Sequence, residues 1–204
     1  MPVAFKGLLD ALLSEHRKVN KFYQDKLVVG FLGAVSSGKS SGIKALWGFD
    51  SGTIHPIPGT TRDVVVWSTN EGYVVADTPG LQDSNEELIK KTKNFIDNVD
   101  IFVYIINSNG GINQKVKDDI ELLTKVNRPL LVILNKIDTI PDRNETGFVK
   151  KQLEDSNILV DDFIEAAFNP ITGEAPVNID RIKNRINMII NENGEVLLER
   201  VCQT

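Results

Sequence analysis

Residues 33–40 read Gly-Ala-Val-Ser-Ser-Gly-Lys-Ser, the complete pattern G-x-x-x-x-G-K-[ST] of a phosphate-binding loop. Glycines let the chain wrap closely around phosphate, and successive backbone N–H groups then form an anion nest at a helix N-terminus. We expect Lys39 to reach the β- and γ-phosphates of a nucleotide and the Ser40 hydroxyl to bind Mg²⁺. The residues expected to contact nucleotide here are Ala34, Val35, Ser36, Ser37, Gly38, Lys39, Ser40 and Ser41.

Two further segments offer groups for a metal ion and for the γ-phosphate. The tetrapeptide DTPG begins at Asp77, whose carboxylate can hold Mg²⁺ through water, and ends at Gly80, whose N–H can meet the γ-phosphate. Residues 58–63 read PGTTRD, and we prefer Thr61 to Thr60 as the hydroxyl that completes the metal shell when the γ-phosphate is present. The predicted metal ligands are Ser40, Thr61 and Asp77.

The tetrapeptide Asn135-Lys136-Ile137-Asp138 has the chemistry needed to read a purine base. The Asp138 carboxylate can accept hydrogen bonds from N1–H and the N2 amino group of guanine, and adenine would leave it unpaired at a cost of about 1–3 kcal/mol or more. Asn135 can either bond the base or tie neighbouring loops together, and the Lys136 stem can lie over the ring. The tetrapeptide therefore predicts selection of GTP over ATP.

Short apolar runs alternate with amphipathic stretches, which predicts an α/β fold in which the motifs end or follow strands. We expect a mainly parallel six-stranded sheet with one antiparallel edge strand, a hairpin at 63–77, and helices on both faces. Trp47 and Trp67 are expected to be packing residues. The expected strands are 27–33, 63–69, 73–77, 100–107, 129–135 and 162–168. The expected helices are 3–24, 39–48, 85–98, 113–127, 143–155 and 178–192.

Bulk properties narrow the class of protein. The chain has 204 residues, enough for one well-buried domain, and its net charge of −5 argues against a broad basic face for nucleic acid. A single cysteine, Cys202, cannot form an internal disulfide, which favours a reducing, cytoplasmic location. No apolar run reaches the roughly 18 residues needed to span a bilayer, so no transmembrane segment is expected.

Together, the motifs GAVSSGKS, PGTTRD, DTPG and NKID resemble those of translation-factor-class G domains of the TrmE–Era–EngA–septin-like group, over about residues 27–192. PGTTRD is similar to the first switch of TrmE- and EngA-type proteins. SSGKSS at 36–41 is instead similar to the phosphate loop of dynamin-related proteins, and the choice between these branches stays open. The resemblance implies a P-loop NTPase G domain that hydrolyses GTP to GDP and phosphate with Mg²⁺, as a molecular switch.

The sequence departs from the family pattern at two functional positions. Where the family usually has Ser-Ala-Lys, this chain has Glu165-Ala166-Ala167-Phe168, and we expect backbone N–H groups near Ala166 and Ala167 to meet the guanine carbonyl. Leu81 follows DTPG and cannot orient the attacking water as a glutamine does. The resemblance then implies another source of positive charge, K⁺ or Na⁺ near Ser36 or a dimer partner. The expected catalytic residues are Lys39, Thr61, Gly80 and Ser36.

The expected domains are an amphipathic helix at 1–24, a G domain at 25–194 and a tail at 195–204. Beyond GTP and GDP, a homodimer across the nucleotide face is one expected partner arrangement, and a membrane-surface, ribosomal or RNA partner stays open. The alternative function is a scaffold or dimerising dynamin-like module in which hydrolysis only resets partner or membrane binding. Gly42, in the middle of a predicted helix, has no role in any of these expectations.

Overall fold

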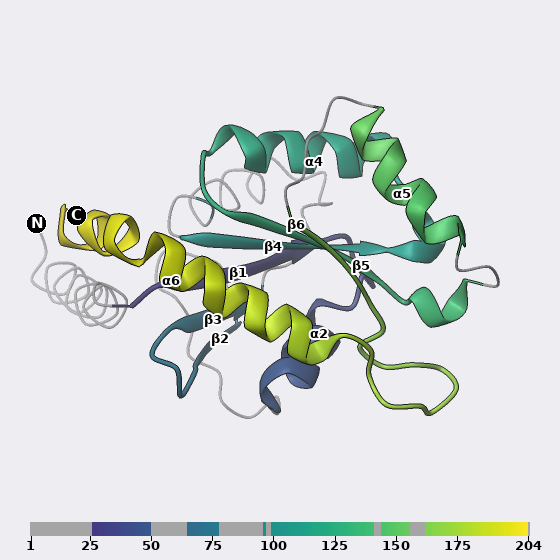
Figure 1. Ribbon diagram of the computed structural model, residues 1–204, viewed down its shortest axis with the longest axis horizontal. Coiled ribbons are helices and arrows are strands. Elements are labelled where there is room, and N and C mark those ends of the chain that lie inside the picture. Colours follow the sequence, from purple (N-terminus) through teal and green to yellow (C-terminus); the bar gives the residue numbers. More distant parts are fainter. Residues whose placement is uncertain are drawn as a thin grey trace, which may run out of the picture.

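The computed structural model describes residues 26–49, 65–77, 96, 99–140, 144–155 and 162–203, without the side chains of 144–146 and 194–203. The predicted helix at 3–24 lies outside these residues, as does that at 85–98 apart from Ile96. Elements are labelled as in Figure 1.

A six-stranded sheet in the order β2-β3-β1-β4-β5-β6 forms the centre of the molecule (Figure 1). Every neighbouring pair is parallel except β2 with β3, which confirms the predicted mixed sheet with one antiparallel edge strand. The turn between β2 and β3 contains Gly72 at a φ of 92°, as the predicted hairpin requires. The strands are β1 (Val28–Gly33), β2 (Val65–Ser68), β3 (Val74–Asp77), β4 (Ile101–Asn107), β5 (Leu130–Asn135) and β6 (Asp162–Ala166).

Helices cover both faces of the sheet, with α2 and α6 on one side and α4 and α5 on the other (Figure 1). The helices are α2 (Lys39–Trp47), α4 (Gln114–Lys125), α5 (Asn144–Glu154) and α6 (Ile179–Gln203), with 3₁₀ turns η1 (Ser108–Gly110) and η2 (Ile137–Thr139). None of the helices in the described part of the chain combines the length and apolar character needed to cross a bilayer.

The last helix is longer than the sequence predicts. The predicted helix ends at 192, whereas α6 extends to Gln203, so most of the segment expected to be a tail is helical. The single Gly194 costs a helix only about 1 kcal/mol relative to Ala, and the residues after it include the good helix formers Glu, Leu and Arg. The domain boundaries themselves stay predictions.

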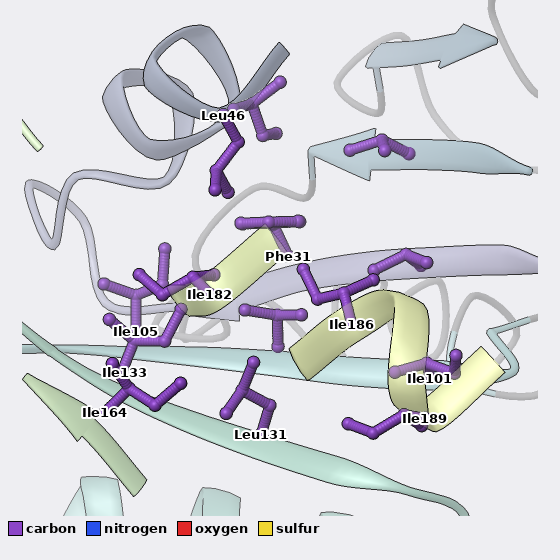
Figure 2. Close-up of a cluster of buried hydrophobic side chains, with 14 of the residues drawn as sticks. Phe31, Leu46, Ile101, Ile105, Leu131, Ile133, Ile164, Ile182, Ile186 and Ile189 are labelled. Carbon is purple, nitrogen blue, oxygen red and sulfur yellow. The ribbon is translucent and has the colours of Figure 1, made fainter. Parts of the chain in front are cut away.

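Two hydrophobic cores lie on opposite faces of the sheet. Alternate residues of β4 enter different cores: Ile101, Val103 and Ile105 face α2 and α6, and Phe102 and Tyr104 face α4. This burial on both faces explains why β4 and its parallel neighbours β1 and β5 read as unbroken apolar runs. Figure 2 shows the first core, in which Ile182, Ile186 and Ile189 of α6 approach side chains from β1, β4, β5 and β6.

An aromatic cluster joins the end of α2 to the β2–β3 hairpin. Phe49 stacks between Trp47 and Trp67, with ring centroids 6.3 Å and 5.9 Å apart. The Trp47 indole N–H also donates to the Tyr73 hydroxyl at 3.2 Å. Both tryptophans are therefore packing residues, as expected.

Burial along α6 leads to a direct test of its packing. Ile186 is fully buried while Met188, two residues further on, is 52% exposed. We expect Ile186→Ala to lower the free energy of unfolding by about 2–5 kcal/mol, because a large buried side chain is replaced by a cavity. The matched control Met188→Ala is expected to change it by less than about 0.5 kcal/mol. Urea unfolding of both variants measures this, and equal losses would contradict the packing described.

Candidate functional site

The phosphate-loop motif lies between the C-terminal end of β1 and the start of α2. Gly33 has a φ of 137°, and a Cβ there would lie 2.3 Å from the Ile105 carbonyl oxygen, so only glycine fits. Gly38 caps α2 with a φ of 100° and no side-chain hydrogen bond. The first N–H groups of a helix have no partner within it, so the start of α2 is suited to binding an anion.

The residues of this loop differ in exposure. Val35 is 67% exposed, and Ser36 and Ser41 are also exposed. Ser36 has a left-handed φ of 62°. Ser37 is fully buried, and its hydroxyl has no hydrogen-bond partner. Ala34 is half-buried at the loop's start. Ser41 belongs to the first turn of α2, so Val35 and Ser36 form the exposed rim of the loop itself, where a second molecule or an ion can approach.

The Lys39 ammonium group folds back over the phosphate loop. Its Nζ donates to the carbonyl oxygens of Gly33 and Ala34, both at 3.0 Å. Burial lowers the pKa of Lys39, and the nearby Asp77 carboxylate opposes that effect. The ammonium is thus held against the first two residues of the loop.

Ser40 and Asp77 come together as the sequence predicts for a metal site. The Ser40 hydroxyl donates to Asp77 Oδ2 at 2.5 Å, whereas the buried Asp77 Oδ1 has no hydrogen-bond partner. Burial raises the pKa of Asp77, and the Ser40 hydrogen bond and the Lys39 charge act against it. An orphaned carboxylate oxygen beside a hydroxyl fits Mg²⁺, which prefers oxygen ligands. Thr61 and Gly80 lie outside the described residues, so their roles stay predictions.

Asn135, at the end of β5, joins two loops. Its Nδ2 donates to the Ser37 carbonyl oxygen at 2.8 Å, and its Oδ1 accepts from the Phe168 N–H at 3.1 Å. The residue is only 2% exposed. Of the two roles open from the sequence, the structure shows the second, in which Asn135 ties the phosphate loop to the segment after β6.

Small residues make room for this connection. A Cβ on Gly38 would lie 2.2 Å from Asn135 Nδ2, and a Cβ on Gly42 would lie 2.7 Å from the buried ring of Phe168. Gly42 therefore lets Phe168 pack against α2, which places the Phe168 N–H on Asn135. Sequence reasoning missed this role, because the signal, a glycine inside a helix, gains meaning only when its distant neighbour is known.

The base-reading tetrapeptide forms a tight turn after β5. Lys136 has a left-handed φ of 67°, and its carbonyl oxygen accepts hydrogen bonds from Ser108 Oγ at 2.8 Å and Thr139 Oγ1 at 2.6 Å. Asp138 Oδ2 accepts from the backbone N–H of Ile171 at 2.9 Å. Sequence reasoning missed Ser108, Thr139 and Ile171, since hydroxyl and backbone donors carry no motif.

Ala166 and Ala167, which stand where the family usually has Ser-Ala-Lys, lie at and directly after the end of β6. Ala166 is the last residue of β6 and pairs with Asn135, and the Ala167 carbonyl oxygen accepts from the Val177 N–H at 2.9 Å. Both alanines are almost fully buried. Their predicted backbone contact with the guanine carbonyl stays a prediction.

The model of the family described as 50S ribosome-binding GTPase matches residues 28–136, more than half of the chain. The chain belongs to this family. The match begins at β1 and ends within the base-reading tetrapeptide, so it contains both the phosphate loop and the Asp77 segment. It confirms the resemblance to the TrmE–Era–EngA–septin-like group and identifies the chain as a GTP-binding domain.

Individual members of this GTPase family match different lengths of the chain. A GTPase Der of Persephonella marina is 29% identical over 143 residues, which is 64% of this chain and 32% of that protein. A GTPase Era of Borreliella burgdorferi is 30% identical over 165 residues, 76% of this chain and 53% of that protein. The chain therefore spans about a third of the first relative's length and about half of the second's.

The fold agrees with that of a solved member of this family. Aquifex aeolicus Era, solved as a variant bound to GDP and AlF4⁻, superposes with a TM-score of 0.63 at 20% identity, covering 78% of this chain and 55% of that one. This confirms the predicted P-loop G-domain fold.

The contact between Gly42 and Phe168 predicts an unusual response to alanine. Gly42→Ala should raise helix propensity by about 1 kcal/mol, yet we expect a net loss of about 1–3 kcal/mol in the free energy of unfolding because the new methyl group meets the Phe168 ring. Gly147 lies in α5, where an added Cβ would meet nothing within 4 Å, so Gly147→Ala is expected to stabilise the chain. Urea unfolding compares the two, and stabilisation by both would contradict the role given to Gly42.

Proposed function

We propose that this domain binds GTP and hydrolyses it to GDP and phosphate with Mg²⁺, and so acts as a nucleotide-dependent switch. The observation that carries the proposal is the Asn135 side chain, which bonds both the phosphate loop and the segment after β6. The parallel strands β1, β3, β5 and β6 end at one edge of the sheet, where such folds bind ligands. One nucleotide can thus meet Lys39 with its phosphates and Asp138 with its base.

In this proposal, the residues of the chain mainly position and neutralise the phosphates. Lys39 would exchange its carbonyl partners for phosphate oxygens, while Ser40 and Asp77 would hold Mg²⁺. The metal, when bound, would neutralise charge that develops on the phosphate oxygens. Thr61 and Gly80 are proposed from the sequence for the metal shell and the γ-phosphate. Without assistance, such domains turn over slowly, on the order of 10⁻⁴ to 10⁻² s⁻¹.

We further propose that K⁺ or Na⁺ near Ser36 accelerates hydrolysis, in a homodimer across the nucleotide face. Ser36 supports this because it is exposed on the rim of the phosphate loop in a left-handed conformation. The neighbouring Val35 exposes 67% of its surface on the same rim, which suits contact with a second molecule. The exposure of Val35 also favours the alternative function, a dimerising module whose hydrolysis only resets partner binding. Partner capture with a GTP analogue but not with GDP, at unchanged turnover, would favour the module.

The role of Asp138 gives a test of base recognition. We expect Asp138→Asn to weaken GDP binding by about 100-fold or more, because the charged hydrogen bonds to guanine are lost. The same variant should gain affinity for xanthosine diphosphate, since an amide can donate to its 2-carbonyl group. Titration with fluorescent nucleotides measures both, and Asp155→Asn, an exposed site at the end of α5, is the matched control. Wild-type protein that binds ADP as tightly as GDP would refute the proposed function.

The proposed cation site predicts a dependence of turnover on the salt. GTP hydrolysis should be at least about tenfold faster in KCl than in choline chloride, because a fixed positive charge stabilises the transition state. Ser36→Ala should reduce this ratio, and the rate per molecule should rise with protein concentration if a dimer forms. Phosphate release assays measure these rates. Identical turnover in potassium, sodium and choline salts at all protein concentrations would remove the cation and the dimer from the mechanism.

A further inference from the structure

The loop between β6 and α6 is fixed at both of its ends. The Val177 N–H donates to the Ala167 carbonyl oxygen at 2.9 Å, and Asn178 Nδ2 donates to the Glu165 carbonyl oxygen at 2.8 Å. Pro170 within the loop is buried, although residues 171–176 are all exposed. The exposed part of the loop is thus held by hydrogen bonds from Val177 and Asn178 to the end of β6 and the residue after it.

The fixed loop presents one backbone donor to the base-reading segment. The Gly173 N–H donates to the Pro170 carbonyl oxygen at 3.2 Å, which closes a β-turn with Ile171 at its second position. From this position the Ile171 N–H donates to Asp138 Oδ2 at 2.9 Å. The Ile171 side chain is 82% exposed and takes no part in the contact.

The Asp138 carboxylate needs a fixed hydrogen-bond donor in order to discriminate guanine from other bases. Rotation of an aspartate carboxylate about its last side-chain bond is broadly distributed, so its plane is not fixed by rotamer preference. Two hydrogen bonds to the edge of guanine require both oxygens to lie in the plane of the base, whereas a single hydrogen bond does not. Each carboxylate oxygen can accept two hydrogen bonds, so Oδ2 can serve Ile171 and a base together.

We propose that the Ile171 N–H is a specificity-determining positioning group, which holds the Asp138 carboxylate in the orientation that guanine requires. This inference rests on the proposed function, in which Asp138 reads the base. Ala166, Ala167 and Phe168 carry no polar side chain, and within the described residues Ile171 is the hydrogen-bond donor found on this carboxylate. When a purine ring covers the contact, the exclusion of water strengthens it.

Loss of the Ile171 N–H should affect the binding of GDP more than that of inosine diphosphate, which lacks the N2 amino group. GDP needs both carboxylate oxygens in plane and therefore depends on Ile171, while inosine diphosphate offers N1–H alone. A general loosening of the loop would weaken both nucleotides by the same factor. The ratio of the two dissociation constants therefore reports the orientation of the Asp138 carboxylate and not a general loosening of the loop.

The test compares Ile171→Pro with Ile171→Ala. Both variants lack the isoleucine side chain, and only the first lacks the N–H, so their difference isolates the hydrogen bond. Proline is favoured at the second position of a β-turn, so the substitution suits the local backbone. Relative to Ile171→Ala, we expect Ile171→Pro to bind GDP about tenfold more weakly and inosine diphosphate less than about threefold more weakly. Displacement of fluorescent GDP measures each constant, and thermal unfolding without nucleotide checks the fold.

A second variant acts on the same loop without touching Ile171. Asn178 has a left-handed φ of 62°, which glycine adopts freely, so Asn178→Gly removes only the anchor to Glu165. It should reduce the preference for GDP over inosine diphosphate in the same direction, by a smaller factor.

Equal affinities of the two Ile171 variants for GDP would overturn the inference, as would equal weakening of both nucleotides. If Ile171→Pro does not fold, an unchanged GDP preference in Asn178→Gly overturns it instead. Failure of the wild-type chain to bind GDP would refute the proposed function itself, which is a separate outcome.

Discussion

Two loops of the candidate nucleotide site are joined by a single buried side chain. The Asn135 amide donates to the Ser37 carbonyl oxygen and accepts from the Phe168 N–H, so these hydrogen bonds go to the backbone of two different loops. Buried backbone groups without partners cost about 1–3 kcal/mol each, so loss of the amide would destabilise both loops together. One side-chain amide thus links the phosphate-loop motif to the segment after β6, and Asn135 itself begins the tetrapeptide that is predicted to read the base.

The hydrogen bonds of Asn135 also require two neighbouring positions without a side chain. Gly38 leaves room for Asn135 and Gly42 leaves room for Phe168, and a methyl group at either position would displace a group that the site needs. The two glycines are close in the sequence, because Gly38 directly precedes α2 and Gly42 lies in its first turns. This explains why the chain keeps a glycine inside a helix despite its cost of about 1 kcal/mol.

Much of the fold can be predicted because its signals are local. Strands β1, β4 and β5 are unbroken apolar runs, and Lys39, Ser40, Asp77 and Asp138 follow from motif spacing alone. The rest depends on contacts that spacing does not encode. Gly42 makes sense only beside Phe168, and Ile171 contacts Asp138 through its backbone N–H, which every residue type except proline has. The predicted end of the last helix at 192 is wrong, because α6 continues through Gly194 to Gln203 and the residues after this glycine include good helix formers.

The aromatic cluster at the end of α2 has a consequence for the segment that carries PGTTRD. Phe49, two residues beyond the end of α2, and Trp67 of β2 stack with ring centroids 5.9 Å apart, and residues 50–64 lie between Phe49 and the start of β2 in the sequence. The stack brings together the ends of this connection as part of folding, so its loop-closure entropy is lost before any nucleotide arrives.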